Sequence, residues 1–223
     1  MSKPEVIVYS TISVDGGLDY IDKKIVLSSS RDFTRLHYFR SIVDAVMIGS
    51  NTVIKDNPLL TIRLPAYTGR QPYRVVVDGD LKLKPDYRVF DTTIAPSILI
   101  TSIDNCYSEK TDLFRKKNIG VICTNRLTDK ELDLNKALID LNKLFNINKI
   151  LVEGGGYLIG TLIKQKLVDK IVVSISPTIL GLNKVDLIRV VLDKPLKLNI
   201  MNIYYDDLTN EVIISYKPDY SSL

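Results

Sequence analysis

Short runs of β-branched residues alternate with amphipathic stretches along most of the chain. This alternation is typical of strands connected by helices, which assemble into a mostly parallel sheet with helices on both faces. Seven runs predict strands, at residues 6–9, 45–48, 74–77, 97–101, 120–123, 149–152 and 170–175. The sequence therefore predicts an α/β fold.

Amphipathic stretches between these runs predict helices. In the first, Ser30 is expected to cap a helix that continues to about Ile42. Its apolar positions lie about one turn apart, at Phe33, Leu36, His37 and Phe39–Arg40. Two further helices are expected at Leu134–Phe145 and Leu158–Lys166.

The C-terminal part has a different pattern. Lys197–Tyr205 and Glu211–Tyr216 alternate in the manner of strands around the turn-forming residues Asp206–Asn210. This pattern predicts an antiparallel hairpin at the sheet edge, which makes the sheet mixed. No repeat, linker or shift of composition marks a boundary, and one core can serve a chain of 223 residues. A single domain over residues 1–223 is therefore expected.

Composition and charge exclude several classes of protein. The net charge of +4 is spread along the chain without a basic block, which argues against nucleic acid and favours small anionic ligands. Cys106 and Cys123 are far apart in sequence and only one histidine is present, so we expect free thiols in a reducing compartment and no metal site. The first apolar run, Val6–Tyr9, is too short for a signal segment or a membrane span. These features predict a cytoplasmic protein.

A glycine cluster, Glu153-Gly154-Gly155-Gly156, stands between a predicted strand and a predicted helix. Glycines at such a turn let backbone N–H groups approach a phosphate at the helix N-terminus, so a diphosphate cofactor is a candidate ligand. Ile159 occupies the place of the third glycine of the usual dinucleotide fingerprint, which disfavours a conventional Rossmann domain. Glu153 is equally consistent with a solvated cap and with an acceptor for a ligand's N–H groups.

The segment Gly49–Arg63 contains a second candidate site. Thr52 and Asp56 are one helical turn apart if a short helix begins near Ser50 and ends at Asn57-Pro58. Spacing alone favours a capped turn with a solvated aspartate. Arg63 and Arg40 are either surface cations or a pair that binds a phosphate or carboxylate.

Two further turns follow predicted strands, at Asp78–Leu81 and at Ser13–Gly16. Each is consistent with a plain turn or with a ligand contact. His37 is expected to be a packing or surface residue and not a proton donor. The motifs of zinc deaminases, Walker-type phosphate loops and nucleophile elbows are all missing from the sequence.

Taken in order, these segments resemble the reductase domain of bacterial bifunctional riboflavin-biosynthesis deaminase-reductases. They resemble more closely the separate archaeal and fungal reductases of that pathway. The resemblance implies a dihydrofolate-reductase-like fold and a homodimer. The segments that carry it are Ser13–Gly16, Arg40–Asp44, Gly49–Arg63, Pro72–Gly79, Glu153–Leu158, Leu167–Lys170 and Pro177–Gly181.

The resemblance also implies a set of binding residues. Positions that match the family's NADPH contacts are Thr52, Asp56, Gly79, Asp80, Leu81, Lys82, Gly154, Gly155, Gly156 and Tyr157. Positions that match its substrate contacts are Arg40, Leu60, Arg63 and Glu153, with Lys24 as a weaker match. Lys24 is also a candidate acid, but the resemblance assigns no catalytic proton donor. Lys82 or Arg88 is a candidate partner for the 2′-phosphate of NADPH.

The reaction implied by the resemblance is hydride transfer from NADPH to the ribose C1 of a phosphorylated ribosylamino-pyrimidine. Because the deaminase half is missing, the 2,5-diamino-pyrimidinone is the expected substrate. The deaminated 5-amino-6-(ribosylamino)uracil 5′-phosphate, a dihydrofolate reductase activity and a non-catalytic nucleotide-binding module remain as alternatives. The implied reaction requires the turn after Val152 and the Thr52–Arg63 segment to face one cleft.

Overall fold

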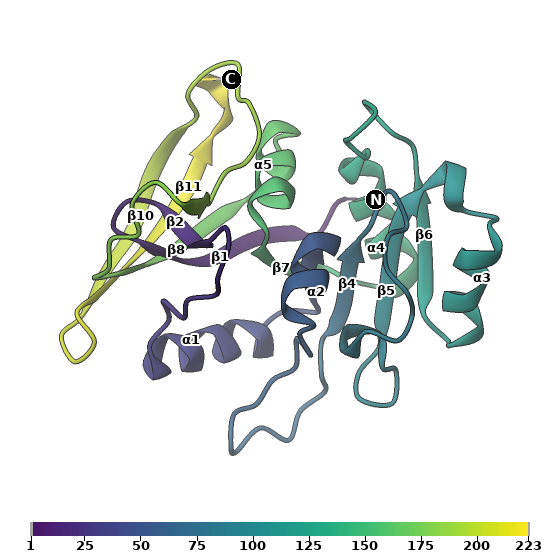
Figure 1. Ribbon diagram of the computed structural model, residues 1–223, viewed down its shortest axis with the longest axis horizontal. Helices are drawn as coiled ribbons and strands as arrows, with labels where there is room; N and C mark the ends of the chain where they lie inside the picture. Colours follow the sequence, from purple (N-terminus) through teal and green to yellow (C-terminus); the bar gives the residue numbers. More distant parts are fainter. Residues whose placement is uncertain (1, 223) are drawn as a thin grey trace. The chain divides into compact units, whose positions relative to one another are not determined.

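The computed structural model describes residues 2–222 and divides into two compact units. The first unit contains the residues up to Glu5 together with His37–Leu151. The second contains Val6–Leu36 and the residues from Val152 onward. Each unit contains strands of one nine-stranded sheet together with helices, so the predicted α/β class is confirmed (Figure 1). The single domain stays a prediction.

The first unit is built on four parallel strands in the order β3 (Ala45–Gly49), β4 (Tyr73–Val77), β5 (Ser97–Ser102) and β6 (Gly120–Thr124). Their register pairs Met47 with Val75 and Val76 with Leu99. Strands β3 and β5 are buried on both faces, which explains why their sequences are rich in apolar residues. The helices of this unit are α2 (Ser50–Asp56), α3 (Glu109–Lys116) and α4 (Leu134–Phe145), with short 3₁₀ turns η1 (Arg88–Phe90) and η2 (Ile103–Asn105).

One apolar cluster forms the core of the first unit. Val46, Ile48 and Val76 from the strands pack with Val53 of α2, and the rings of Phe90 and Phe114 meet edge to face at 5.1 Å. The helices begin and end at ordinary caps. The Asp133 carboxylate accepts a hydrogen bond from the Lys136 N–H at the start of α4.

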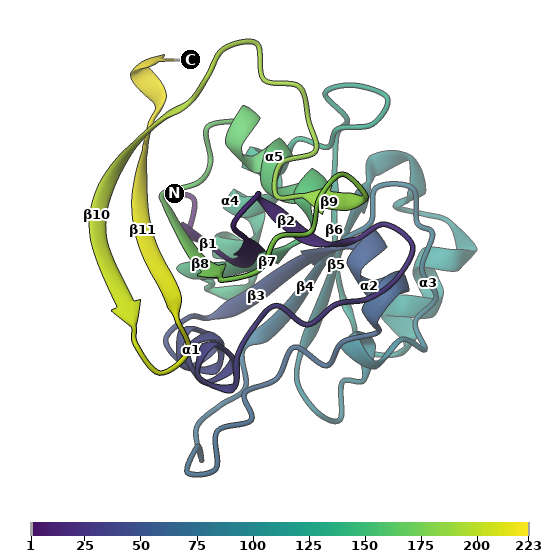
Figure 2. The same ribbon diagram turned by 60° about the vertical axis from the view of Figure 1, so that its left-hand side comes forward.

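The second unit contains a mixed sheet in the order β10 (Lys197–Asp206), β11 (Glu211–Asp219), β8 (Lys170–Ser176) and β1 (Glu5–Ser13). β1 and β8 are parallel, whereas β8, β11 and β10 are antiparallel to one another in succession. The predicted C-terminal hairpin is therefore confirmed, with β10 as its outer strand (Figure 2). A small second sheet pairs β2 (Gly17–Tyr20) with β9 (Lys184–Asp186), and a last 3₁₀ turn, η3, spans Tyr220–Ser222.

Strand β7 (Lys149–Gly154) leads from the first unit to the second, and α5 (Gly156–Lys164) follows it. The predicted start of α5 at Leu158 is wrong by two residues, because the helix begins inside the glycine cluster. Helix α1 (Ser30–Ser41) is confirmed with nearly the expected bounds.

The expected character of α1 is wrong in two respects. Its cap is Ser29, whose hydroxyl accepts a hydrogen bond from the Asp32 N–H at 3.1 Å, and not Ser30. Its buried face is also polar, because Asp32, His37 and Arg40 are buried while Phe33 is exposed. Apolar periodicity misidentified this face because buried polar partners on other segments compensate its charges.

The expectation of free thiols is wrong, because Cys106 and Cys123 form a disulfide. The pairing of β5 with β6 places the end of η2 beside β6 and so brings together two cysteines 17 positions apart. Within residues 2–222, no helix has the length and apolar character that a membrane crossing needs.

Candidate active site

The candidate residues divide between the two units. Arg40, the Thr52–Arg63 segment and the Gly79–Lys82 turn belong to the first unit. Lys24 and the Glu153–Tyr157 turn belong to the second. The expectation that Glu153 and Arg63 face one cleft stays a prediction. In the part of the chain that the structure describes, no cluster of His, Cys, Asp and Glu has the composition of a metal site.

Helix α2 has the predicted position and length. Thr52 is half-buried and Asp56 is exposed one turn later. Asn57 ends the helix in a left-handed conformation, with φ of 40°, and its N–H donates to the Val53 carbonyl at 2.9 Å. The short helix thus presents both side chains at the end of strand β3.

The loop that carries Arg63 is held by polar residues of α1. The Arg40 guanidinium donates to the Thr61 carbonyl at 2.7 Å, and His37 Nδ1 accepts a hydrogen bond from the Arg63 N–H at 3.1 Å. Leu60 is buried with φ of 54°, a conformation that a branched side chain rarely adopts. Arg40 is therefore not a surface cation, and the packing role expected of His37 is confirmed. Arg63 itself is exposed on a fixed backbone.

The turn after β4 is more firmly fixed than a plain β-turn. The Asp78 carbonyl accepts from the Leu81 N–H at 3.1 Å, and its buried carboxylate accepts from the Leu83 N–H at 2.8 Å. The second carboxylate oxygen of Asp78 is buried and has no hydrogen-bond partner among residues 2–222. Leu81 has φ of 53°. Several contacts thus determine the conformation of residues 78–83.

Charged residues flank this turn. Asp80 forms ion pairs with Arg126 at 2.8 Å and with Lys82 at 3.1 Å. Hydrogen bonds from both residues lower the pKa of the Asp80 carboxyl, and the bond from Arg126 has the larger effect. Lys82 is therefore already paired with a carboxylate, which leaves it a weaker candidate for an added phosphate.

Arg88 is held differently. Its N–H donates to the Asn57 side chain at 2.9 Å, and its carbonyl accepts from the buried Arg74 guanidinium at 3.1 Å. Its own side chain is exposed and forms no ion pair with any residue in 2–222. Because Asn57 directly follows Asp56, the backbone of Arg88 lies beside the end of α2.

The glycine turn of the second unit has two separate requirements for glycine. Gly154 has φ of +123°, and a Cβ built there meets no atom within 4 Å. A Cβ on Gly156 would lie 2.5 Å from the Asp186 carbonyl oxygen and 3.0 Å from that of Leu187. Gly156 is thus required by close packing, whereas space is open beside Gly154. Half-buried Glu153 and exposed Tyr157 flank the glycines.

The Ser13–Gly16 turn binds another segment that carries the family resemblance. The Asp15 carboxylate accepts hydrogen bonds from the Ser13 hydroxyl at 2.6 Å and from the backbone of Leu180 at 3.0 Å and Gly181 at 2.8 Å. These hydrogen bonds lower the pKa of Asp15 to about 2, and the bond from Ser13 contributes most. These hydrogen bonds therefore give the motif a structural role that needs no ligand. Lys24 is exposed in the segment between β2 and α1.

A family model described as the RibD C-terminal domain matches residues 4–209. The chain belongs to this family. Within it, 180 residues are 32% identical to 2,5-diamino-6-ribosylamino-4(3H)-pyrimidinone 5′-phosphate reductase of Methanothermobacter thermautotrophicus, with 80% of each chain covered. The riboflavin biosynthesis protein RibD of Aquifex aeolicus is also 32% identical over 180 residues, which cover 80% of this chain and 48% of that protein. The predicted family is confirmed.

Solved structures of the RibD C-terminal domain family share the fold. The structure of Acinetobacter baumannii RibD (form 2) matches 97% of this chain and 58% of that chain, with a TM-score of 0.82 and 18% identity. The riboflavin biosynthesis reductase Rib7 of Saccharomyces cerevisiae matches 97% and 90% of the two chains, with a TM-score of 0.75 and 20% identity. This chain therefore spans about half of the RibD proteins and most of Rib7.

Sequence reasoning missed a cluster of buried charges at the α1 end of the second unit. The Arg35 guanidinium donates to Asp206 at 2.8 Å and to Glu211 at 2.6 Å, and it lies 3.5 Å from Asp32. The Tyr9 hydroxyl donates to Asp32 at 2.5 Å. Burial, and then the Asp32 charge, raise the pKa of Tyr9. No local pattern identifies this cluster, since its members come from four separate segments.

Proposed function

We propose that this protein is an NADPH-dependent reductase of riboflavin biosynthesis that acts on 2,5-diamino-6-(ribosylamino)-4(3H)-pyrimidinone 5′-phosphate and forms the ribitylamino product. The observation that carries this proposal is the match to the Methanothermobacter reductase, which extends over 80% of both chains. A second relative with that name, from Aquifex aeolicus, is 30% identical over 81% of this chain. Two relatives of similar length are thus named for the same activity.

The cofactor role is assigned to three segments. The open space beside Gly154 and the start of α5 suit a diphosphate, because a helix N-terminus presents unpaired N–H groups. Thr52 and Asp56 of α2 and the fixed Gly79–Lys82 turn are the proposed contacts in the first unit, and Gly155, Gly156 and Tyr157 complete those in the second. When bound, the nicotinamide supplies the hydride, while the protein binds and orients the reactants.

The substrate role is assigned to Arg40, Leu60, Arg63 and Glu153, with Lys24 as a further contact. Arg63 is proposed to bind the phosphate, because its backbone is fixed by His37 while its side chain is exposed. Arg40 maintains the loop through the Thr61 carbonyl. The Glu153 carboxylate is proposed to accept hydrogen bonds from the pyrimidine N–H groups. The proton donor is left unassigned.

One experiment separates the proposal from its alternatives. The purified protein is incubated with NADPH and, in parallel, with the diamino pyrimidine, its deaminated counterpart or dihydrofolate, and the products are analysed by mass spectrometry. A gain of two mass units with the diamino compound is expected. Exclusive reduction of another compound would reassign the substrate, and NADPH binding without turnover would indicate a non-catalytic module.

Arg88 is proposed to select NADPH over NADH. Replacing Arg88 with glutamine removes a cation whose backbone lies beside the end of α2, so the KM for NADPH is expected to rise about tenfold while that for NADH stays within about twofold. Steady-state kinetics with both cofactors measure the difference. The matched variant Lys82→Gln should change the ratio of the KM for NADPH to the KM for NADH less, since Asp80 pairs with that lysine. If Lys82→Gln changes this ratio of KM values and Arg88→Gln does not, Lys82 and not Arg88 selects NADPH over NADH.

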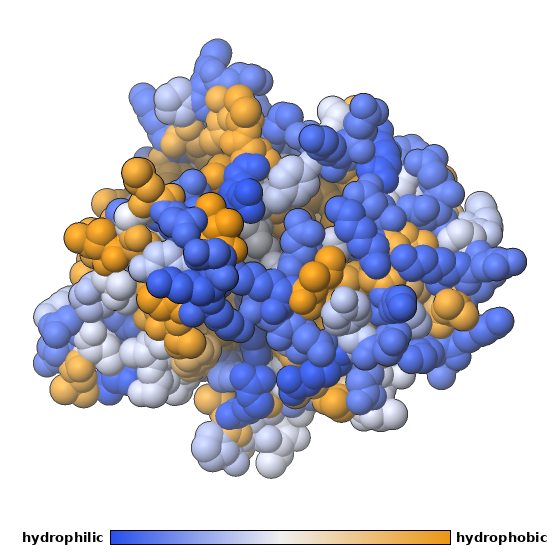
Figure 3. Space-filling model, in the orientation of Figure 1, coloured by the Kyte–Doolittle hydropathy of each residue, from blue (hydrophilic) through white to orange (hydrophobic). Residues whose placement is uncertain are grey.

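A homodimer is proposed to form through the C-terminal hairpin. On β10, Ile200, Ile203 and Tyr205 are between 56% and 60% exposed, and they share one face with Val212 and Ile214 of β11. Hydrophobic residues gather over this hairpin on the face shown in Figure 3. An apolar outer strand of this kind is an interaction surface in stable proteins, and pairing with a second copy would be self-complementary.

The variant Ile203→Lys places a charge in this surface and is expected to convert the dimer to a monomer in sedimentation velocity at micromolar concentration. Leu127→Lys, at a similarly exposed residue of the first unit, is the control and should leave the dimer intact. A dimer that survives Ile203→Lys would place the interface elsewhere. The cytoplasm is the proposed location, and no nucleic acid or membrane partner is proposed.

A further inference from the structure

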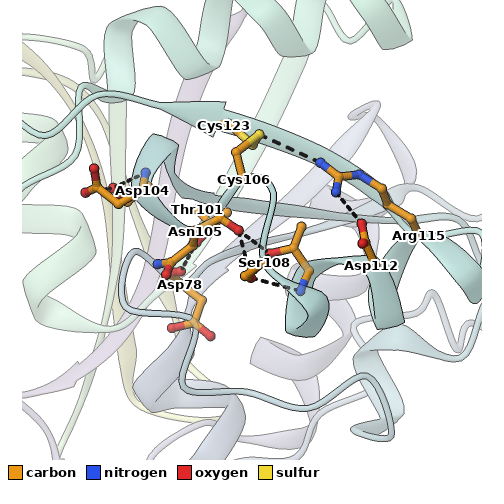
Figure 4. Close-up of a disulfide and its surroundings, with 11 residues drawn as sticks. Asp78, Thr101, Asp104, Asn105, Cys106, Ser108, Asp112, Arg115 and Cys123 are labelled. Atoms are coloured by element: carbon orange, nitrogen blue, oxygen red, sulfur yellow. Dashed lines mark hydrogen bonds and ion pairs between the residues drawn. A yellow bond between two sulfur atoms is a disulfide. The ribbon is translucent and has the colours of Figure 1, made fainter.

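The disulfide joins two segments that lie beside the proposed cofactor turn. Cys106 directly follows η2 at the end of β5, and Cys123 lies in the neighbouring strand β6. Their Cα atoms are 5.7 Å apart. Figure 4 shows the disulfide in the same region as Asp78, Thr101 and Asn105, and the Thr101 hydroxyl donates to the Asp78 carbonyl at 2.9 Å. The crosslink is therefore part of the structure that surrounds residues 78–82.

Both crosslinked segments donate to the same backbone oxygen. The Asn105 side-chain amide donates to the Gly79 carbonyl at 2.9 Å, and one Arg126 guanidinium nitrogen donates to that carbonyl at the same distance. Asn105 directly precedes Cys106, and Arg126 is three residues after Cys123. The Gly79 oxygen thus has two donors, and the two segments that supply them are covalently joined.

We infer that the Cys106–Cys123 disulfide, with Asn105 and Arg126, positions the Gly79–Lys82 turn for the dinucleotide, so that cofactor affinity depends on the redox state of the two cysteines. The inference rests on the proposed function, because the turn is a proposed cofactor contact. The pairing of β5 with β6 brings the two donor segments together, and the disulfide adds a covalent link between the end of η2 and β6. Once the crosslink is broken, only non-covalent contacts hold η2 and its Asn105 beside β6, so this segment gains freedom to move.

The redox step is an ordinary exchange with a dithiol. Dithiothreitol reduces the bond by transferring two electrons and two protons. The sulfur–sulfur bond breaks, Cys106 and Cys123 become thiols, and dithiothreitol becomes a cyclic disulfide. A low-molecular-weight disulfide oxidises the two thiols again and is itself reduced to thiols.

Amide hydrogen exchange tests the positioning directly. The Leu81 and Leu83 amides are suitable probes, because both donate to Asp78 inside the turn. In the dithiothreitol-reduced protein and in the Cys106→Ser/Cys123→Ser variant, their exchange is expected to accelerate about tenfold. Unchanged exchange in the reduced protein would overturn the inference. The reduced wild-type protein provides this measurement even where the double variant fails to fold.

Kinetics provide the second readout. The KM for NADPH is expected to rise about fivefold on reduction and in Asn105→Ala, while the KM for the pyrimidine stays constant. Asn142→Ala is the matched control, because that side-chain amide also donates to a backbone carbonyl, that of Ile147, away from the turn. Equal increases in both KM values, or the same effect in Asn142→Ala, would indicate general loosening and overturn the inference. Faster Leu81 and Leu83 exchange in a protein that reduces no pyrimidine would contradict the proposed function and leave the positioning role intact.

Discussion

Replacing Arg35 with methionine is expected to lower the free energy of unfolding by about 3–5 kcal/mol. Asp32 and Glu211 are each 1% exposed, and the guanidinium of Arg35 contacts both together with Asp206. Methionine retains the packing volume but removes the charge, so buried carboxylates lose their cation. An uncompensated buried charge costs far more than the ion pair itself contributes.

Urea denaturation at neutral pH measures this loss. The control is Arg115→Met, which removes an exposed partner of Asp112 and should cost less than about 1 kcal/mol. Similar losses in both variants would mean that the buried cluster contributes no more than a surface ion pair.

The effect of Arg35→Met is also expected to depend on pH. Burial alone would raise the pKa of Asp206, but hydrogen bonds from Arg31 and Arg35 outweigh it and lower the pKa. A lowered pKa in the folded state stabilises the protein above the ordinary value near 3.8, and this contribution disappears as the pH falls through the folded value. The difference between wild type and variant should therefore narrow below about pH 4. If the difference in free energy of unfolding between wild type and Arg35→Met grew as the pH fell, the role of the lowered Asp206 pKa would be contradicted.

The variant Arg63→Ala is expected to raise the KM for the phosphorylated pyrimidine about 30- to 100-fold and to change the KM for NADPH less than about threefold. The guanidinium is proposed to form paired hydrogen bonds with the phosphate, and alanine removes both. Because the Arg63 backbone is held through its own N–H by His37, the loop should keep its conformation.

Steady-state kinetics with each reactant varied in turn measure both constants for Arg63→Ala. Arg70→Ala is the matched control, since that arginine is exposed on the same loop and stacks on the Tyr73 ring. Equal changes in both KM values, or no change in either, would count against a phosphate role for Arg63.

Strand positions were predictable because burial on both faces leaves a direct trace in sequence. β3 and β5 are short runs rich in apolar residues, and the C-terminal hairpin shows two alternating, strand-like stretches around a turn. Helix α2 was predictable from the stop at Asn57-Pro58. The family resemblance supplied the candidate residues at these strand ends.

Contacts between distant polar residues were not predictable. The polar residues of α1 depend on distant partners, because Arg35 pairs with Asp206 and Glu211 from the far end of the chain and Arg40 donates to the Thr61 carbonyl. The disulfide depends on the pairing of β5 with β6, and the Asp15 carboxylate reaches a loop 165 positions later. A single sequence contains no local signal for such partners, because burial of a charge is decided by what packs on it.

The packing of Gly156 against the backbone of Asp186 and Leu187 limits how this corner of the protein can diversify. A side chain at Gly156 would collide with backbone carbonyl oxygens, which shift less readily than the end of a flexible side chain, while one at Gly154 would be strained by its backbone conformation. Neither glycine can therefore acquire new recognition chemistry by simple replacement. At this corner, a change of ligand preference would have to come from Glu153 or Tyr157, the residues on either side.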